Sequence, residues 1–107
     1  MRDVGVIGFA QTKHVRRERG LNEVEMVMPI LEEVRNKAGV TKDEIGFTCS
    51  GSTDYLAGVG FSFVMTLDGA GPWPPIQESH VEMDGAFALY ESWGKLQLGD
   101  IDCALVF

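Results

Sequence analysis

The sequence is short of basic residues relative to acidic ones. Its 107 residues hold 9 Lys and Arg against 16 Asp and Glu, which gives a net charge of −7. Because sequence-independent nucleic-acid binding depends on basic side chains that neutralise phosphates, this balance argues against a nucleic-acid partner. The one basic cluster is interpreted as a solvated loop, with an anion grip for a phosphorylated cofactor as the alternative. It consists of Lys13, Arg16, Arg17 and Arg19.

Cysteine is also scarce, and long apolar runs are missing. The two thiols, Cys49 and Cys103, lie too far apart in the sequence for a short-spaced metal-ligand pair, and are typical of reduced thiols rather than a disulfide framework. No run reaches the roughly 18 apolar residues of a membrane span, and no export signal precedes the first strand-like segment. We therefore expect one cytoplasmic globular domain without a membrane span.

The pattern of apolar residues predicts alternating strands and helices. Strands are expected at residues 4–9, 45–49, 76–83 and 102–107, and helices at residues 22–38 and 84–98. Residues 55–67 are apolar but loosened by glycine, and residues 69–75 form a firm break. This order indicates an α/β fold with a parallel sheet and crossover helices. The last strand is apolar, yet nothing in the sequence covers its open edge, which predicts a piece of a longer protein.

Two helix starts carry capping boxes, in Asn22 with Glu25 and in Thr41 with Glu44. Pro29 predicts a kink in the first helix, or a regular helix that begins at the proline. In the last helix, an apolar stripe is expected to face the core. It consists of Ala86, Leu89, Tyr90, Trp93 and Leu96.

Two stretches carry side chains capable of chemistry. Residues 49–52 offer nucleophile types at a strand end, but they lack a G-x-S-x-G elbow and no histidine is near in sequence, so a small-residue turn is favoured. In residues 78–84, period-two alternation places Glu78, His80 and Glu82 on one face of an extended chain. Such a row binds a metal, shuttles a proton, or lies at an interface; a structural charge pair or interface is the default.

The segment from Glu78 onward, with the helix and strand behind it, resembles a known family. An extended chain, a tight turn, Gly-Ala-Phe-Ala-Leu at residues 85–89, an amphipathic helix and a final strand to residue 106 are similar to the nucleophile-elbow region of the thiolase superfamily. The resemblance is closest to sterol-carrier-type and lipid-transfer-protein thiolases, which are acetyl-CoA acetyltransferase-like. Residues 4–12 and 38–45 are similar to the same family. The resemblance covers residues 1–107 and implies the N-terminal portion of an incomplete three-layer, parallel-sheet half-domain.

The resemblance also implies where the chemistry would lie. Working thiolases carry a cysteine at the N-terminus of that helix, and the matching position here is Glu82. A carboxylate there would benefit from the helix dipole, but it cannot form the thioester of thiolytic condensation. The catalytic residues implied are Glu82 and His80, acting as a base or electrostatic element on a coenzyme A thioester substrate, with no metal and no covalently bound cofactor. Acid and base residues of other thiolases come from later segments, so these 107 residues by themselves are expected to be inactive.

Two functions therefore remain open. The first is an acyl-CoA-handling protein of lipid or steroid degradation whose chemistry has moved away from cysteine. The second is a non-catalytic thiolase-like scaffold or lipid-carrier subunit, because fold similarity alone cannot separate the two. The resemblance further implies a homodimer through residues 76–81, which begin at Ile76 and end at Val81, or assembly with a further protein subunit. An exposed edge strand kept soluble by charge is the alternative.

Overall fold

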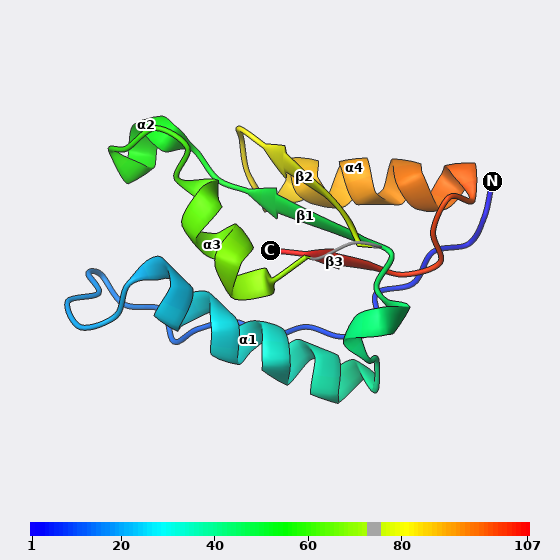
Figure 1. Ribbon diagram of the computed structural model, residues 1–107, viewed down its shortest axis with the longest axis horizontal. Coiled ribbons are helices and arrows are strands. Elements are labelled where there is room, and N and C mark those ends of the chain that lie inside the picture. The colour runs from blue at the N-terminus through cyan, green and yellow to red at the C-terminus, as the bar shows by residue number, and fades with distance from the viewer. Residues whose placement is uncertain (73–75) are drawn as a thin grey trace.

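The computed structural model describes residues 1–72 and 76–107, and its elements form three layers (Figure 1). A small parallel sheet lies in the middle. Helix α4 (Gly85–Leu98) packs on one face of the sheet, and helix α3 (Phe63–Ala70), backed by α1 (Glu23–Ala38), packs on the other. The predicted α/β class is confirmed at this level. No helix in the described residues is long and apolar enough to cross a membrane.

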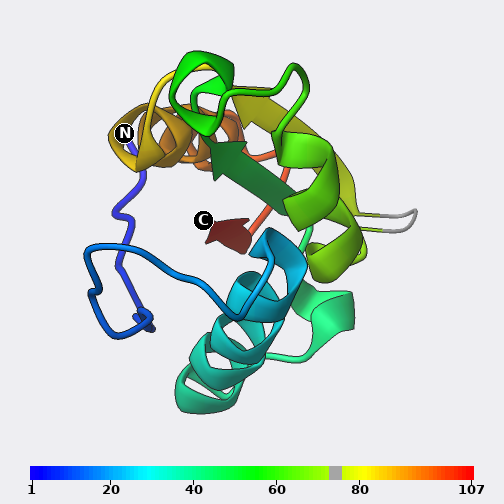
Figure 2. The same cartoon turned by 90° about the vertical axis from the view of Figure 1, so that its left-hand side faces the viewer.

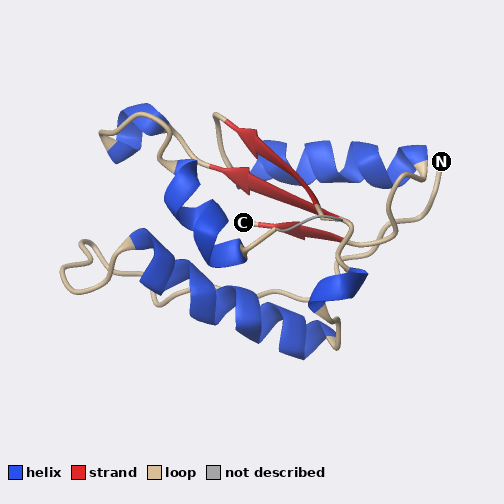
Figure 3. Cartoon of the chain, in the orientation of Figure 1, coloured by secondary structure: helices blue, strands red, loops and turns tan. Residues whose placement is uncertain are grey.

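The sheet has the strand order β2-β1-β3, with both pairs parallel (Figure 3). Strand β1 (Phe47–Gly51) is central, between β2 (Gln77–Val81) and β3 (Ala104–Val106). The central strand is the most buried element, because neighbours cover both of its edges and helices cover both of its faces. The core cluster sits where β1 meets α4. It consists of Phe47, Cys49, Ala88 and Ile101.

The helix starts follow the predicted capping boxes. The Asn22 side chain accepts a hydrogen bond from the Glu25 N–H at 2.9 Å, and the Glu25 carboxylate accepts one from the Asn22 N–H at 2.9 Å. Helix α1 begins at Glu23, so Pro29 lies inside it and does not start it. The Thr41 and Glu44 box opens a short 3-10 turn, η1 (Lys42–Glu44). These motifs form as expected because each depends on residues only three positions apart.

The glycine-loosened segment at residues 55–67 is two helices rather than one. Helix α2 (Asp54–Ala57) ends at Gly58, and α3 runs on through Gly69 before it ends at Gly71. Gly71 has φ of 58°, a left-handed conformation that favours glycine at a helix end. The predicted break at residues 69–75 is therefore wrong in its first two residues. Its remainder includes Trp73, Pro74 and Pro75, which lie outside the described residues.

The predicted first strand, residues 4–9, is wrong: this N-terminal segment does not join the sheet. It runs along the side of the molecule (Figure 2), and Val6 is 80% exposed. The sheet therefore has three strands, not four, in the described chain. Apolar, β-branched composition makes a segment fit for a strand, but a strand also needs a neighbour to which its main chain can hydrogen-bond. None of the described strands pairs with this segment.

The apolar stripe predicted on α4 does not face the sheet. The helix residues buried against the sheet layer are Ala88 and Ser92, whereas Tyr90 is 69% exposed and stacks on Trp93 with ring centroids 5.7 Å apart. Small side chains let the helix axis lie close to β1, and the larger ones are turned to the side. Only Leu96 of the predicted stripe packs against the core cluster.

Candidate functional site

The candidate site lies at the carboxyl ends of β1 and β2, where parallel pairing brings two polar side chains together. Ser50 of β1 is the register partner of His80 of β2. Ser50 Oγ lies 3.0 Å from His80 Nδ1. Both side chains lie on the face of the sheet covered by α3, where the Phe63 ring stacks on the imidazole at 4.2 Å between centroids and 13° between planes. The stacking and the register together fix the orientation of the imidazole.

Glu82 completes a line of three groups. Its Oε2 lies 3.3 Å from His80 Nε2, so the predicted placement of these two residues on one face is confirmed. The His80 side chain is 12% exposed and that of Glu82 is 52% exposed. The line therefore runs from the buried hydroxyl of Ser50, through the imidazole, to a carboxylate at the surface.

The second oxygen of Glu82 holds the chain that follows β1. Glu82 Oε1 accepts a hydrogen bond from the Asp54 N–H at 2.6 Å. The Asp54 carboxylate in turn accepts bonds from the main-chain N–H groups of Phe61 and Ser62. The Ser62 and Phe61 N–H groups lower the pKa of the Asp54 carboxyl, with a smaller lowering from nearby His80. The segment above the site is thus tied to the sheet through carboxylates.

The amides at the start of α4 do not point at Glu82, which corrects the expected role of the helix dipole. Asp84 is the N-cap, and its Oδ1 accepts from the N–H groups of Ala86 at 3.0 Å and Phe87 at 3.2 Å. The turn also packs tightly against Gly51, where an added Cβ would lie 2.4 Å from the Asp84 carbonyl oxygen. Asp84 takes the amides because it is adjacent to the first turn, whereas Glu82 lies two residues earlier.

Neither thiol belongs to this site. Cys49 is fully buried in the core beside Ala88, and burial raises the pKa of its thiol to about 11, with the Glu91 carboxylate adding to the rise. Burial also raises the pKa of the Cys103 thiol. The thiolate is the nucleophilic form of cysteine. Both cysteines are therefore poor nucleophiles, and chemistry at the carboxyl ends of these strands falls to the other groups.

The three-group line favours one arrangement of protons. An ionised Glu82 can only accept, so His80 Nε2 must donate to it. In the neutral imidazole, Nδ1 is then an acceptor for the Ser50 hydroxyl. A hydroxyl, an imidazole and a carboxylate in sequence are the parts of a general acid–base relay, in which the carboxylate orients the imidazole and stabilises its charged form.

Sequence analysis missed Ser50 because its partner is far along the chain. The sequence around Ser50 contains no histidine, and the register of a parallel strand pair brings His80 to it. Glu78, the third member of the predicted row, is exposed and forms no part of the line.

The described residues contain no cluster of three His, Cys, Asp or Glu side chains that could hold a metal ion. The basic cluster near Arg16 is an exposed loop, in agreement with the favoured interpretation.

Comparison of the chain with models of known protein families, with curated proteins and with solved structures found no match.

Proposed function

We propose that the chain is part of a thiolase-like protein that handles acyl-CoA thioesters, and that His80 and Glu82 supply acid–base chemistry where thiolases use cysteine. The single observation that carries the proposal is the hydrogen-bonded line from Ser50 through His80 to Glu82 at the carboxyl ends of parallel strands. Ligand sites of open α/β sheets lie at this edge. Both thiols have raised pKa values, so neither competes as a nucleophile there.

A reaction that suits these groups is carbon–carbon cleavage of a β-hydroxyacyl thioester. Glu82, at the surface end of the line, takes the proton of the substrate hydroxyl, while His80 Nε2–H donates to the same carboxylate and positions it. The bond between the α and β carbons then breaks, a carbonyl compound leaves, and the protonated Glu82 returns its proton to the α carbon of the thioester enolate. No acyl-enzyme forms in this reaction, so the reaction needs no cysteine. Ser50 is assigned as a positioning residue, because its buried hydroxyl holds Nδ1 and fixes the ring.

Binding is the first test, because the chain alone is expected to lack the remaining catalytic residues. A ligand that binds only the native state raises the unfolding temperature. Saturating butyryl-CoA should raise the midpoint by several degrees, since about 1 kcal/mol moves the midpoint of a domain this size by roughly 4–8 °C. Free coenzyme A should give a smaller rise. His80→Gln and Glu82→Gln should each reduce the acyl-CoA shift by at least half.

The matched control is Glu32→Gln, which removes one carboxylate from the exposed side of α1 and should leave the shift unchanged. If neither butyryl-CoA nor coenzyme A moves the midpoint, the acyl-CoA proposal is abandoned. If both bind equally to the parent chain and to all three variants, the site lies elsewhere.

The second candidate is a non-catalytic scaffold or lipid-carrier subunit, and one observation favours it. Large apolar side chains are exposed in the described chain, including Phe9 at 68%, Tyr55 at 90% and Leu56 at 81%. Tyr55 and Leu56 are neighbours on α2, and exposed apolar patches mark interaction sites. For assembly, we propose the homodimer through residues 76–81, because β2 forms one border of the sheet and no strand among the described residues pairs with its outer edge.

A further inference from the structure

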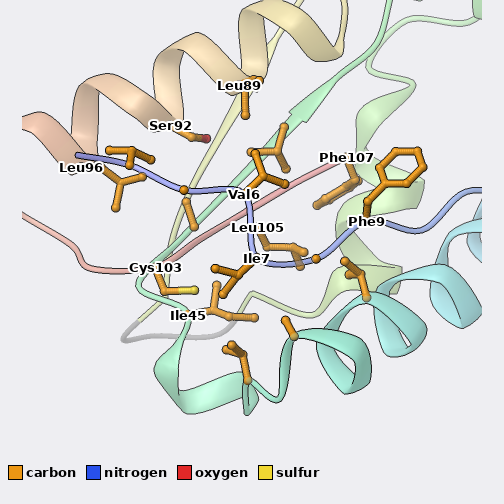
Figure 4. A pocket seen from close by; sticks show the side chains of 18 of the residues that line it. Val6, Ile7, Phe9, Ile45, Leu89, Ser92, Leu96, Cys103, Leu105 and Phe107 are labelled. Atoms are coloured by element: carbon orange, nitrogen blue, oxygen red, sulfur yellow. The ribbon is translucent and has the colours of Figure 1, made fainter. Parts of the chain in front are cut away.

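The opposite border of the sheet faces an apolar slot. The slot lies between β3 and the N-terminal segment (residues 4–9), with α4 and α1 as its other walls, and encloses about 640 Å³. Figure 4 shows side chains from all four elements around this space. The lining is apolar almost throughout, and includes Val6, Ile7, Leu89, Trp93, Leu105 and Phe107.

One long wall of the slot is a row of unpaired main-chain groups. The Cys103 carbonyl accepts from Gly46 N–H, and Phe107 N–H donates to the Cys49 carbonyl, so these odd-numbered residues of the last strand face β1. Main-chain groups alternate between the two sides of a strand. Those of Ala104 and Val106 therefore face the slot, and no described residue hydrogen-bonds to them.

The facing wall has the same character. Residues 4–8 belong to no helix or strand, and their main-chain groups have no hydrogen-bond partner within the described chain. Water would satisfy them on the outer side, but the inner side looks onto apolar side chains. Unpaired peptide groups therefore lie on both sides of a space whose lining is mostly apolar.

Anchors at both ends hold this wall away from β3. At one end the Arg2 guanidinium donates to the Leu96 carbonyl at 3.1 Å and to the Asp102 carboxylate at 2.7 Å. At the other end Gly8 packs against α1 so closely that an added Cβ would lie 3.1 Å from the Ala38 Cβ. Lys37 Nζ also reaches the Phe9 carbonyl at 3.5 Å. The spacing is therefore built by specific contacts and is not a loose end of chain.

We propose that the slot receives an apolar β-strand from outside these 107 residues, which hydrogen-bonds to β3 on one side and to residues 4–9 on the other. The inference is independent of the acyl-CoA chemistry. A strand satisfies both rows of peptide groups, whereas an acyl chain would leave both unpaired in apolar surroundings. Because α4 covers one face of the slot and α1 the other, the strand must be apolar at successive positions.

A second copy of the chain has no such strand to give. The apolar extended stretches of the described chain are β1, β3 and residues 4–9, and each is already a member of the sheet or a wall of the slot. A copy would have to dismantle its own fold to fill the slot of another. The occupant is therefore a polypeptide of different sequence.

The test uses a synthetic nonapeptide of alternating valine and isoleucine that ends in two lysines, which suit the net charge of −7. The control peptide has the same sequence with every second amide N-methylated, which removes one row of hydrogen bonds and keeps the side chains. Binding is measured by fluorescence anisotropy, and amide hydrogen exchange is followed by NMR. We expect the first peptide to bind at least tenfold more tightly, and to slow exchange of the Ala104 and Val106 amides at least tenfold.

Three results would overturn the proposal. First, if the two peptides bind equally, or if neither binds, main-chain pairing plays no part. Second, if the Ala104 and Val106 amides are already protected in the free protein and the protein is dimeric, a second copy fills the slot. Third, if decanoate binds in the slot and the peptide does not, the occupant is an acyl chain. Val106→Pro removes one outward N–H and should weaken peptide binding about tenfold, while the methylated peptide tests the same bonds without changing the protein.

Discussion

At the scale of single residues, adjacent side chains on the two faces of β1 lie in different chemical environments. Cys49 points toward α4 and is sealed in the core, whereas Ser50 faces α3 and holds the imidazole of His80. Strand alternation alone separates an inert thiol from a hydrogen-bonded hydroxyl one position away. The pKa of the Cys49 thiol, raised to about 11, shows that this part of the core excludes charge.

That raised pKa predicts a specific loss of stability at alkaline pH. The native state keeps the Cys49 proton up to a pH of about 11, whereas the unfolded chain releases it near its ordinary pKa of 9.0. The stabilisation is complete below pH 9 and is lost as the pH rises toward 11, by about 1 kcal/mol at pH 10. Urea unfolding at pH 7.5 and pH 10 should show a larger loss in the parent chain than in Cys49→Ala, which keeps the raised pKa of the Cys103 thiol. Equal losses in both proteins would contradict it.

At the scale of elements, two carboxylates near the start of α4 have separate roles. Asp84 caps the helix, while Glu82 bonds to the imidazole and to the Asp54 N–H. Each acid thus has a separate set of donors. The helix can keep its cap whatever happens to the site, and the site can change without unwinding the helix.

Substitutions at these two positions should therefore have different effects. Asp84→Ala should lower the free energy of unfolding by about 1 kcal/mol, because two N–H groups lose their acceptor. Asp84→Asn keeps an acceptor oxygen and should lose much less. Glu82→Gln should change the acyl-CoA shift described above without changing helix stability. Urea unfolding followed by circular dichroism measures all three. Equal losses for the two Asp84 variants would refute the capping role.

Local signals account for most of what the sequence predicts correctly. The capping boxes at Asn22 and Thr41 and the extents of α1 and α4 involve residues within a few positions of one another. The Ser50–His80 contact depends on a register between strands, which local sequence does not contain. The N-terminal segment has strand composition but no strand, because pairing requires a neighbour at the right distance. On α4 the small residues Ala88 and Ser92 face the sheet, so the stripe of large apolar side chains predicts the wrong face of the helix.

At the scale of the whole molecule, the sheet ends in two borders of unlike character. The outer edge of β2 carries Glu78 and the site histidine, whereas β3 faces the apolar slot. Gln77 donates to the Gly46 carbonyl and the Val81 carbonyl accepts from Ser52, so these residues face β1. By alternation, the main-chain groups of Glu78 point outward. A polar border suits a symmetric contact at a wet interface, and an apolar border suits a buried strand.

The dimer proposed through β2 can be tested at that outward position. Glu78→Pro removes an outward N–H and leaves the bonds to β1, since proline is tolerated on edge strands. We expect light scattering to show a dimer for the parent chain and a monomer for this variant. Glu78→Thr keeps the N–H and should remain dimeric, which separates the loss of pairing from the loss of charge. A monomeric parent chain at tens of micromolar, or a dimeric proline variant, would rule the dimer out.

The parallel pairing has a consequence for the order in which the protein assembles. Phe47 aligns with Gln77 in one pair and with Ala104 in the other, and Arg2 meets Asp102. Each of these contacts closes a long loop, and the chain loses conformational entropy before the contact can stabilise it. The sheet is therefore slow to assemble. During synthesis, strand β1 is made before both of its neighbours and stays uncovered until they follow, and Arg2 waits for Asp102. Nascent chains of this kind are natural clients of chaperones.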